Sequence, residues 1–480
     1  MREDAVGELR ERLIRRASAP RAEADAGSSL DFRISALLRD VQLLEHTIDL
    51  VTPKRLFLLD CGADFRYDRW GVPMRVLFST IGSRGDVQPG VALASELTAL
   101  GHEVSVCVPP DFRQWIENLG IPVTPIGPEV RRFAASRPTA TQPQSALTAE
   151  QRRQMAEATV ATQFDTLISA AQEVDVIVAA SALQVAARSV AEKMGIPYVF
   201  AAYTPVVLPS PHHAPPPLPT LPGQASPTTN DNRELWARDS ARFNDLFGAA
   251  VNARRKSLGL AEISEVRSHM MTDQPWLAAD RMLAPWPDPT DSRVFQTGAW
   301  ILPDERPLSR DLDEFLEAGD PPIYFGFGST RAPAEAGKVM LHAARALGRR
   351  AIVSQGWFED SLVANDSDCI SIGEVNVHTL FPRVAAVVHH GGAGTTTAAA
   401  LAGAPQVVIP NHYDQHYWGR RVHTLGIGTA HAAGAPTEES LAQALARSLR
   451  PEVAARARVV AGTVRRDGTR VAAERLAAFA

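Results

Sequence analysis

The residues best suited to chemistry lie in one segment, Val387 to Ala398, where two histidines precede a glycine-rich stretch. Its apolar, β-branched start, its glycines and its alanine-rich end predict a strand, a tight turn and a helix. The start of such a helix offers unpaired N–H groups and the positive end of the helix dipole, which favour a phosphate or diphosphate. His390 would add a hydrogen-bond donor there. A glycine turn without a ligand is the alternative, which the paired histidines and the threonines make less attractive.

The elements that must position this segment alternate between strand and helix. From Met74 onwards, apolar runs predict strands at residues 75–80, 104–108, 174–179 and 197–201. A turn at residues 82–86 and a helix over residues 90–100 follow the first strand. Strands that alternate with helices are typical of a parallel sheet with crossover connections, as in a Rossmann-like domain.

A second alternation begins after the proline-rich segment 297–322, which predicts a domain crossing. Residues 323–330 are expected to form a strand that ends in a glycine turn with hydroxyls, and further strands are expected at residues 351–354, 384–389 and 406–410. The polar segment Asn411 to Gln415 follows the last of them. Open parallel sheets bind ligands at the carboxyl ends of their strands. The fold class is therefore α/β, with two Rossmann-like domains that face each other across a cleft.

The predicted domain organisation has three parts. Residues 1–73 form an extension of unknown role, residues 74–305 the first Rossmann-like domain, and residues 306–480 the second, whose final helices are expected to pack back. The extension reflects either a start codon assigned upstream of Met74 or a genuine appendage. In the second case it offers a route to an oligomer.

Composition excludes several classes of protein. The chain has 480 residues, 45% of them hydrophobic and 21% charged, and a net charge of -5, so no broad basic face is available for nucleic acid. Cys61, Cys107 and Cys369 are far apart, which indicates neither disulfides nor a zinc site. No apolar run reaches the roughly 18 residues of a membrane span, and no signal sequence is apparent. These features predict a cytoplasmic protein without a stable membrane anchor.

A proline-rich segment from Pro205 to Pro227 contains His212 and His213 and is too irregular for a helix or a strand. We expect it to be a loop over a pocket. Met271 and nearby aromatic residues suit a bulky apolar ligand, although ordinary core packing is an equal alternative for each of them.

Three motifs together resemble those of the inverting GT-B glycosyltransferases of the family 1 type. The segment Gly82 to Pro89 looks like the amino-terminal signature of the branch that holds the glycopeptide-antibiotic glycosyltransferases and the sterol 3-β-glucosyltransferases. Ser210 to Pro216 is similar to the acceptor loop of the glycopeptide enzymes. His389 to Thr396, together with Asp414 and Gln415, resembles the nucleotide-sugar signature. The resemblance covers the chain from Met74 to its end.

This resemblance implies a sugar transfer from a nucleoside-diphosphate sugar, a co-substrate, to a hydroxyl of a hydrophobic natural-product aglycone, with inversion and no cofactor. Asp86 would be the general base, although an aspartate in a glycine turn commonly just bonds to backbone N–H groups. Many relatives carry histidine there, so the aspartate favours the glycopeptide or sterol branch. The residues implied in donor binding are Ser83, Arg84, Ser329, Trp357, Val375, His390, Gly391, Gly392, Gly394, Thr395, Asp414 and Gln415, and those implied in acceptor binding are His212, His213 and Met271.

No metal is implied, because a helix N-terminus, His390 and hydroxyl groups can meet the charge of the leaving group. The single D-x-D of interest, Asp366 to Asp368, falls on a polar loop. The nucleoside, either thymidine or uridine, and the sugar stay open.

Other functions remain open alternatives. The acceptor could be a sterol or lipid, or the chain could be a non-catalytic nucleotide-binding protein that serves a partner transferase. A dinucleotide-dependent oxidoreductase would use a similar sheet, but no G-x-G-x-x-G follows a first strand.

Overall fold

Seven parallel strands form the first sheet in the order β3-β2-β1-β4-β5-β6-β7. Every predicted strand of this half is present, and three short strands, β3, β6 and β7, extend the sheet. The bounds are β1 Arg75–Thr80, β2 Glu103–Val108, β3 Val123–Pro125, β4 Val176–Ala180, β5 Tyr198–Ala202, β6 Trp276–Leu277 and β7 Phe295–Gln296.

The computed structural model describes residues 73–135, 148–181, 183–217, 229–328, 336–356, 366–432 and 434–479. All of them belong to one compact unit, Phe65–Ala480. The predicted extension, residues 1–73, therefore lies outside the described residues except for Pro73, and so do Ser329 and Trp357.

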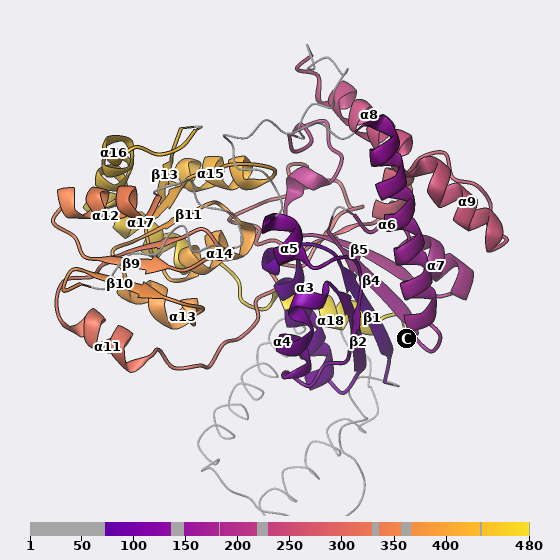
Figure 1. Cartoon of the computed structure of the whole chain (residues 1–480), viewed down its shortest axis with the longest axis horizontal. Coiled ribbons are helices and arrows are strands. Elements are labelled where there is room, and N and C mark those ends of the chain that lie inside the picture. The colour runs from indigo at the N-terminus through magenta and orange to yellow at the C-terminus, as the bar shows by residue number, and fades with distance from the viewer. Residues whose placement is uncertain are drawn as a thin grey trace, which may run out of the picture. The chain divides into compact units, whose positions relative to one another are not determined.

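Alternation along the strands places helices on both faces of the first sheet (Figure 1). Val76 and Phe78 pack on one face with residues of α3 and α18, whereas Leu77 packs on the other with residues of α6 and α7. The helices of this half are α3 Arg84–Ala99, α4 Arg113–Glu117, α5 Val130–Ala135, α6 Ala149–Ala170, α7 Ala187–Met194, α8 Asn232–Phe243, α9 Ala249–Ser257 and α10 Val266–Met271.

Six parallel strands form the second sheet in the order β10-β9-β8-β11-β12-β13. Its strands are β8 Ile323–Gly326, β9 Ala351–Ser354, β10 Cys369–Ile372, β11 Ala386–His389, β12 Gln406–Val408 and β13 Gly428–Ala430. Its helices are α11 Arg310–Glu317, α12 Ala336–Ala346, α13 Val377–Leu380, α14 Ala393–Leu401, α15 Gln415–Thr424, α16 Glu438–Ser448 and α17 Pro451–Ala461. Helices α12 and α16 cover one face, and α11 and α14 cover the other. The two Rossmann-like sheets of a GT-B fold are thus present.

The last helix, α18 (Gly468–Ala477), returns to the first sheet. It contacts α3, and the Arg470 guanidinium lies 3.4 Å from the Glu96 carboxylate of that helix. The crossing is close, because a Cβ on Gly468 would lie only 2.3 Å from the carbonyl oxygen of Ala299. The last helix thus packs back on the first half of the chain.

One predicted boundary is wrong. The helix expected from residue 90 begins at Arg84, so Asp86 lies in the first turn of α3 and not in a loop before it. The physical reason is a capping box, in which Ser83 is the N-cap and Asp86 occupies the third helical position. Pro89 is accommodated inside the helix. The carbonyl that a backbone N–H at position 89 would have bonded belongs to Gly85, an exposed residue.

The strand expected to end in a glycine turn within residues 323–330 is β8, which ends at Gly326. Gly328 then adopts a left-handed backbone, with φ at +57°. That conformation turns the chain out of the sheet.

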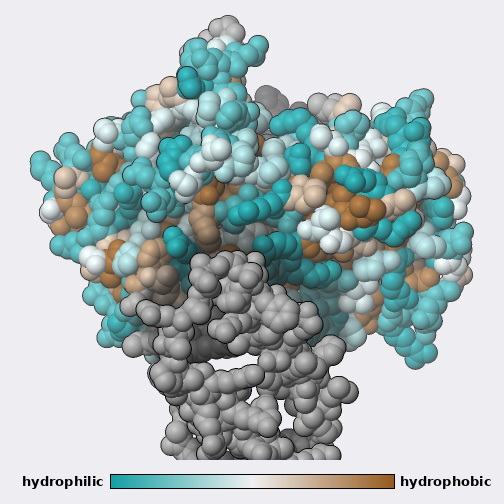
Figure 2. Space-filling view, turned by 180° about the vertical axis from the view of Figure 1, so that it is seen from behind, coloured by the Kyte–Doolittle hydropathy of each residue, from teal (hydrophilic) through white to brown (hydrophobic). Residues whose placement is uncertain are grey.

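Hydrophilic residues predominate on the face seen in Figure 2, where hydrophobic residues gather only in small groups. Among the described residues, no helix combines the length and the apolar character that a bilayer crossing requires.

Close packing between α3 and β1 predicts the effect of a single methyl group. A Cβ on Gly90 would lie 1.9 Å from the ring of Phe78, a fully buried side chain. We expect Gly90→Ala to lower the free energy of unfolding by about 1–3 kcal/mol through overpacking. Urea denaturation would measure this change.

Gly248→Ala is the matched control. Gly248 is also helical, with φ at -55°, but its nearest neighbour to a new Cβ is 3.9 Å away. This variant should be neutral or more stable by about 0.4–1 kcal/mol. Equal destabilisation of both variants would contradict the packing argument.

Candidate active site

The first element of the site is the turn that carries Asp86. One carboxylate oxygen of Asp86 accepts hydrogen bonds from the Ser83 backbone N–H at 2.8 Å and from the Ser83 hydroxyl at 3.1 Å. Gly82 permits this arrangement, since its φ is +151° and a Cβ there would lie 2.2 Å from the same oxygen. Burial raises the pKa of the Asp86 carboxyl, and the bonds from Ser83 partly oppose that rise.

These contacts confirm that Asp86 bonds to a nearby backbone N–H group, as expected for an aspartate in a glycine turn. They also leave its second oxygen outside the contacts with Ser83. A carboxylate that is fixed by one oxygen and has a raised pKa suits a general base.

His389 fixes the shape of the glycine turn between β11 and α14. Its Nδ1 accepts a hydrogen bond from the Gly391 N–H at 3.1 Å, and its Nε2 lies 2.9 Å from the side-chain oxygen of Gln406. These partners require a proton on Nε2, so the ring is neutral, and burial lowers its pKa to about 4. His389 is 0% exposed, so it supports the turn from the protein interior.

His390 lies between two glycine turns. A Cβ on Gly392 would come within 2.6 Å of its Nε2, and one on Gly328 within 3.4 Å of its Cε1. Burial lowers the pKa of His390 to about 3, with a further contribution from neighbouring histidines, so the ring is neutral at pH 7. Its Nδ1 is buried and has no hydrogen-bond partner among the described residues.

The first turn of α14 faces the same region. Gly392 is the N-cap, and the Thr396 hydroxyl donates to its carbonyl at 2.8 Å. Gly394 is exposed and Thr395 is half-buried, whereas Thr396 is 1% exposed. The N–H groups of this turn therefore lie near His390, in an arrangement that suits an anion.

Asp414 and Gln415 follow β12 at the carboxyl edge of the second sheet. Asp414 is the N-cap of α15, and its carboxylate accepts a hydrogen bond from the Trp418 indole at 3.0 Å. Burial, with a smaller contribution from the negative charge of Asp86, raises the pKa of Asp414 to about 7. The charge of Asp86 thus influences Asp414 although the two residues follow strands of different sheets.

Gln415 is mostly buried and ties its own loop together. Its side-chain oxygen accepts from the N–H groups of Asn411 at 2.8 Å and His412 at 3.1 Å. Its side-chain oxygen is thus occupied, and its side-chain NH2 remains as a hydrogen-bond donor. Tyr413, two residues before it, has a φ of +56°, a strained backbone of the kind found at functional sites.

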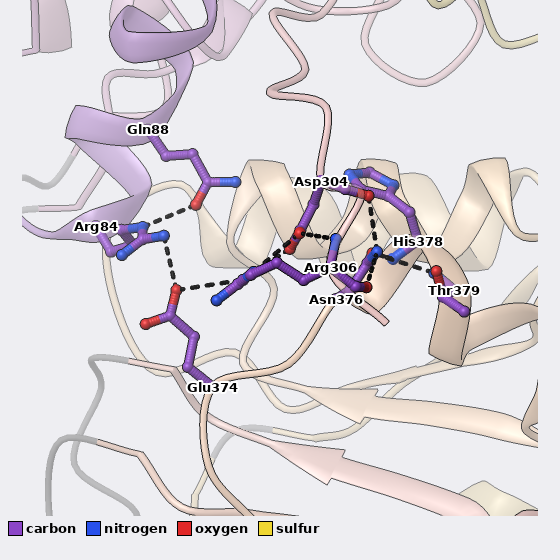
Figure 3. Close-up of polar contacts among 8 residues, drawn as sticks. All are labelled: Arg84, Gln88, Asp304, Arg306, Glu374, Asn376, His378 and Thr379. Atoms are coloured by element: carbon purple, nitrogen blue, oxygen red, sulfur yellow. Dashed lines mark hydrogen bonds and ion pairs between the residues drawn. The ribbon is translucent and has the colours of Figure 1, made fainter. Parts of the chain in front are cut away.

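Arg84 connects the turn that carries Asp86 with the second sheet (Figure 3). Its guanidinium donates to Gln88 at 2.9 Å and to Glu374 at 2.8 Å, and it lies 3.5 Å over the ring of Trp115. Glu374 precedes Val375, the residue expected beside the nucleobase. Sequence patterns did not identify Glu374 because its partner is 290 residues away.

Asn376 anchors the same segment to the connection between the two sheets (Figure 3). Its side-chain NH2 donates to the carbonyls of Asp304 at 2.7 Å and Arg306 at 2.9 Å. Its side-chain oxygen caps α13 by accepting from the N–H groups of His378 and Thr379. Val375 is therefore held on both sides.

The proposed acceptor residues differ in exposure. His212 is exposed, and His213 is half-buried with its Nε2 2.9 Å from the carbonyl of Leu208. The rings of Trp236 and Trp286 pack edge-on to His213. Met271 is 2% exposed and belongs to the core cluster around α10, which favours the packing alternative.

The carboxylates of the D-x-D segment pair with an arginine side chain of the same chain. Asp368 accepts two hydrogen bonds from Arg345, at 2.7 and 2.9 Å, and Asp366 lies 3.8 Å from the same guanidinium. Within the described residues, no group of three potential ligands is arranged to hold a metal ion.

Two family models match the chain. Residues 76–210 match the glycosyltransferase family 28 N-terminal domain. Residues 340–471 match the erythromycin biosynthesis protein CIII-like, C-terminal domain. The first match contains Asp86 and the second contains the glycine turn and Asp414.

Solved structures of similar fold include the glycosyltransferase of kitacinnamycin. It has a TM-score of 0.63 at 21% identity, with 85% of this chain and 99% of that chain covered. CalG4, the calicheamicin glycosyltransferase, has a TM-score of 0.59 at 16% identity, with 85% of this chain and 98% of that chain covered. These likenesses support the GT-B fold.

Curated relatives are much closer in sequence. Glycosyltransferase GtfE of Amycolatopsis orientalis is 49% identical over 84% of this chain and 97% of its own length. The vancomycin aglycone glucosyltransferase of the same organism is 47% identical over the same shares. At this identity and coverage, the chain belongs to the GT-B glycosyltransferases, in the branch that holds the glycopeptide-antibiotic enzymes.

Proposed function

We propose that this glycosyltransferase moves a sugar from a nucleoside-diphosphate sugar to a hydroxyl of a hydrophobic natural-product aglycone, with inversion at the anomeric carbon. The observation that carries the proposal is the contact between helix α3, whose first turn holds Asp86, and helix α14, which begins after His390. The charge of Asp86 also contributes to the raised pKa of Asp414. These observations support a site in which a base, a diphosphate-binding helix start and a sugar-binding carboxylate lie close together.

In the proposed reaction, Asp86 accepts the proton of the acceptor hydroxyl while that oxygen forms a bond to the anomeric carbon. The bond between the anomeric carbon and the diphosphate oxygen breaks on the opposite face, and the bonding electrons leave with the diphosphate. The first turn of α14 and the neutral ring of His390 donate hydrogen bonds to the leaving group. Ser83 and Arg84 would reach it from the first half. The reaction needs no cofactor.

The sugar would lie against α15, where Asp414 and Gln415 meet its hydroxyls. Val375 would border the nucleobase. We assign the donor to the thymidine or uridine diphosphate sugars. One relative named dTDP-epi-vancosaminyltransferase is 43% identical over 81% of this chain, and the structure of VinC contains dTDP.

For the acceptor we propose a glycopeptide aglycone. The support is the 47% identity to the vancomycin aglycone glucosyltransferase. A sterol is the second candidate, but sterol 3-beta-glucosyltransferase UGT80B1 of Arabidopsis thaliana is only 28% identical over 79% of this chain. His212 and His213 would lie beside the acceptor.

Substitution of the base tests the reaction itself. Asp86→Asn keeps an oxygen that can accept from the Ser83 N–H but removes the basic carboxylate. We expect kcat to fall by about 10²- to 10⁴-fold, while the Kd of the nucleoside diphosphate changes by less than about twofold. Steady-state kinetics and calorimetry would measure both, and unchanged turnover would exclude Asp86 as the base.

The raised pKa of Asp86 also predicts a pH dependence. The base must be ionised, so kcat/KM should fall as the pH drops through a pKa above the ordinary aspartate value of 3.8. Retention of full activity down to that value would contradict the proposed role.

His390 is expected to bind the diphosphate as a neutral donor. We predict that His390→Ala weakens nucleoside-diphosphate binding by roughly tenfold or more, since it removes a hydrogen bond to a charged group. His423→Ala, at an exposed position on α15, is the control and should bind normally.

Because the pKa of His390 is about 3, binding at pH 7 should take up much less than one proton at this residue. Calorimetry in buffers of different ionisation enthalpy measures this uptake. Uptake of a full proton that disappears in His390→Ala would show that the ring binds as a cation.

A thermal-shift panel with thymidine, uridine, guanosine and adenosine diphosphates tests the donor class. A ligand at a hundred times its Kd stabilises the folded protein by about 2.7 kcal/mol. We expect a selective shift with thymidine or uridine diphosphate. The absence of any shift, together with absent turnover, would favour a non-catalytic partner of another transferase.

A further inference from the structure

The carboxylate of Asp414 has an unusual environment for a group that must accept hydrogen bonds. It is half-buried and Asp86 adds a like charge, and both influences favour its protonated form. A protonated carboxyl can rotate and donate, which would blur the recognition of sugar hydroxyls. Some other contact must hold the ionised form in one orientation.

Trp418 supplies that contact. It lies one helical turn after Asp414, and its indole N–H donates to one carboxylate oxygen, Oδ2, at 3.0 Å. Trp418 is 1% exposed and packs in the core cluster with Val408 and Val422, and the Tyr417 ring lies edge-on to it at 5.5 Å. The donor therefore has a fixed position.

The backbone that carries Asp414 is fixed independently. Gln415 holds the N–H groups of Asn411 and His412, and Gly391 packs so closely that a Cβ on it would lie 2.7 Å from Val408 and 3.0 Å from the Gln415 carbonyl. With the loop fixed by Gln415, the indole determines where the carboxylate points.

We propose that Trp418 is a positioning residue for sugar recognition: it holds Oδ2 of Asp414 and thereby directs Oδ1 to the hydroxyls of the donor sugar. This inference rests on the proposed function, in which Asp414 meets the sugar. Trp418 itself touches no substrate. Its loss should therefore affect the binding of the sugar and not that of the nucleoside diphosphate.

The test compares Trp418→Phe with Trp300→Phe. Trp300 is also buried, and its indole N–H donates to the Thr297 hydroxyl at 3.1 Å, so both variants lose one indole hydrogen bond. We expect Trp418→Phe to raise the KM for the nucleotide sugar about tenfold, the loss typical of a hydrogen bond to a charged group. The Kd of the free nucleoside diphosphate should change by less than about twofold, and Trp300→Phe should change neither.

A pH profile separates positioning from a general loss of packing. The indole favours the ionised carboxylate, so its removal raises the pKa of Asp414, and the acid limb of kcat/KM moves to higher pH. Part of the activity should return at alkaline pH. When Asp414 is already replaced by asparagine, the further change Trp418→Phe should not move the acid limb of the kcat/KM profile.

If Trp418→Phe does not fold, the wild-type enzyme still tests the proposal. One indole N–H resonance in a 15N-labelled sample should shift with pH around the Asp414 pKa of about 7 and should stop shifting in Asp414→Asn. If no indole N–H resonance shifts in this way, the positioning role is overturned. Equal kinetics of the two tryptophan variants would overturn it as well. If Asp414→Asn keeps the full affinity for the nucleotide sugar, the assignment of Asp414 in the proposed function fails instead.

Discussion

The site depends on one constraint, the direction of parallel strands. All strands of each sheet run the same way, so the chain leaves β1, β11 and β12 at carboxyl edges and starts a helix after each. Helices α3, α14 and α15 therefore begin where their unpaired N–H groups face the site. The residues with proposed chemical roles, Asp86, His390 and Asp414, lie within three residues of these helix starts.

Each helix start is held by a different local contact. Ser83 and Asp86 form a capping box at α3, and His389 accepts from Gly391 before α14. Gln415 closes the loop before α15. In each case a polar side chain accepts a hydrogen bond from a backbone N–H group near the start of the helix. These hydrogen bonds keep flexible glycine turns in one conformation, so a ligand meets N–H donors that are already oriented.

Burial then sets the protonation of the site. Removal from water disfavours charge on every titratable group, so it raises the pKa of Asp86 and Asp414 and lowers that of His390. A carboxylate with a raised pKa is a stronger base, and a neutral imidazole can donate a hydrogen bond from one ring nitrogen. Burial also lowers the pKa of the Arg84 guanidinium, and the neighbouring Glu374 opposes that change.

The sequence by itself determined the two parallel sheets and most of the residues near the candidate site. Long apolar runs such as Arg75–Thr80 and the glycines of the segment from His389 to Thr396 carry local signals, because periodicity and backbone freedom belong to neighbouring residues. The same local signals missed the short strands β6 and β7, each of two residues, which pair only because longer strands provide an edge. The start of α3 was predicted too far along the chain, because Pro89 is unfavourable inside a helix and argues against the capping box before it.

Only the tertiary structure decided which of these residues act together. The bond of Trp418 to Asp414, the ion pair of Arg84 with Glu374 and the influence of Asp86 on Asp414 all depend on side-chain directions or on contacts between distant segments. It also decided that Met271 is part of the core and that His389 supports the turn while His390 faces the site. Distances and burial set these interactions, and neither quantity is encoded in the spacing of residues along the chain.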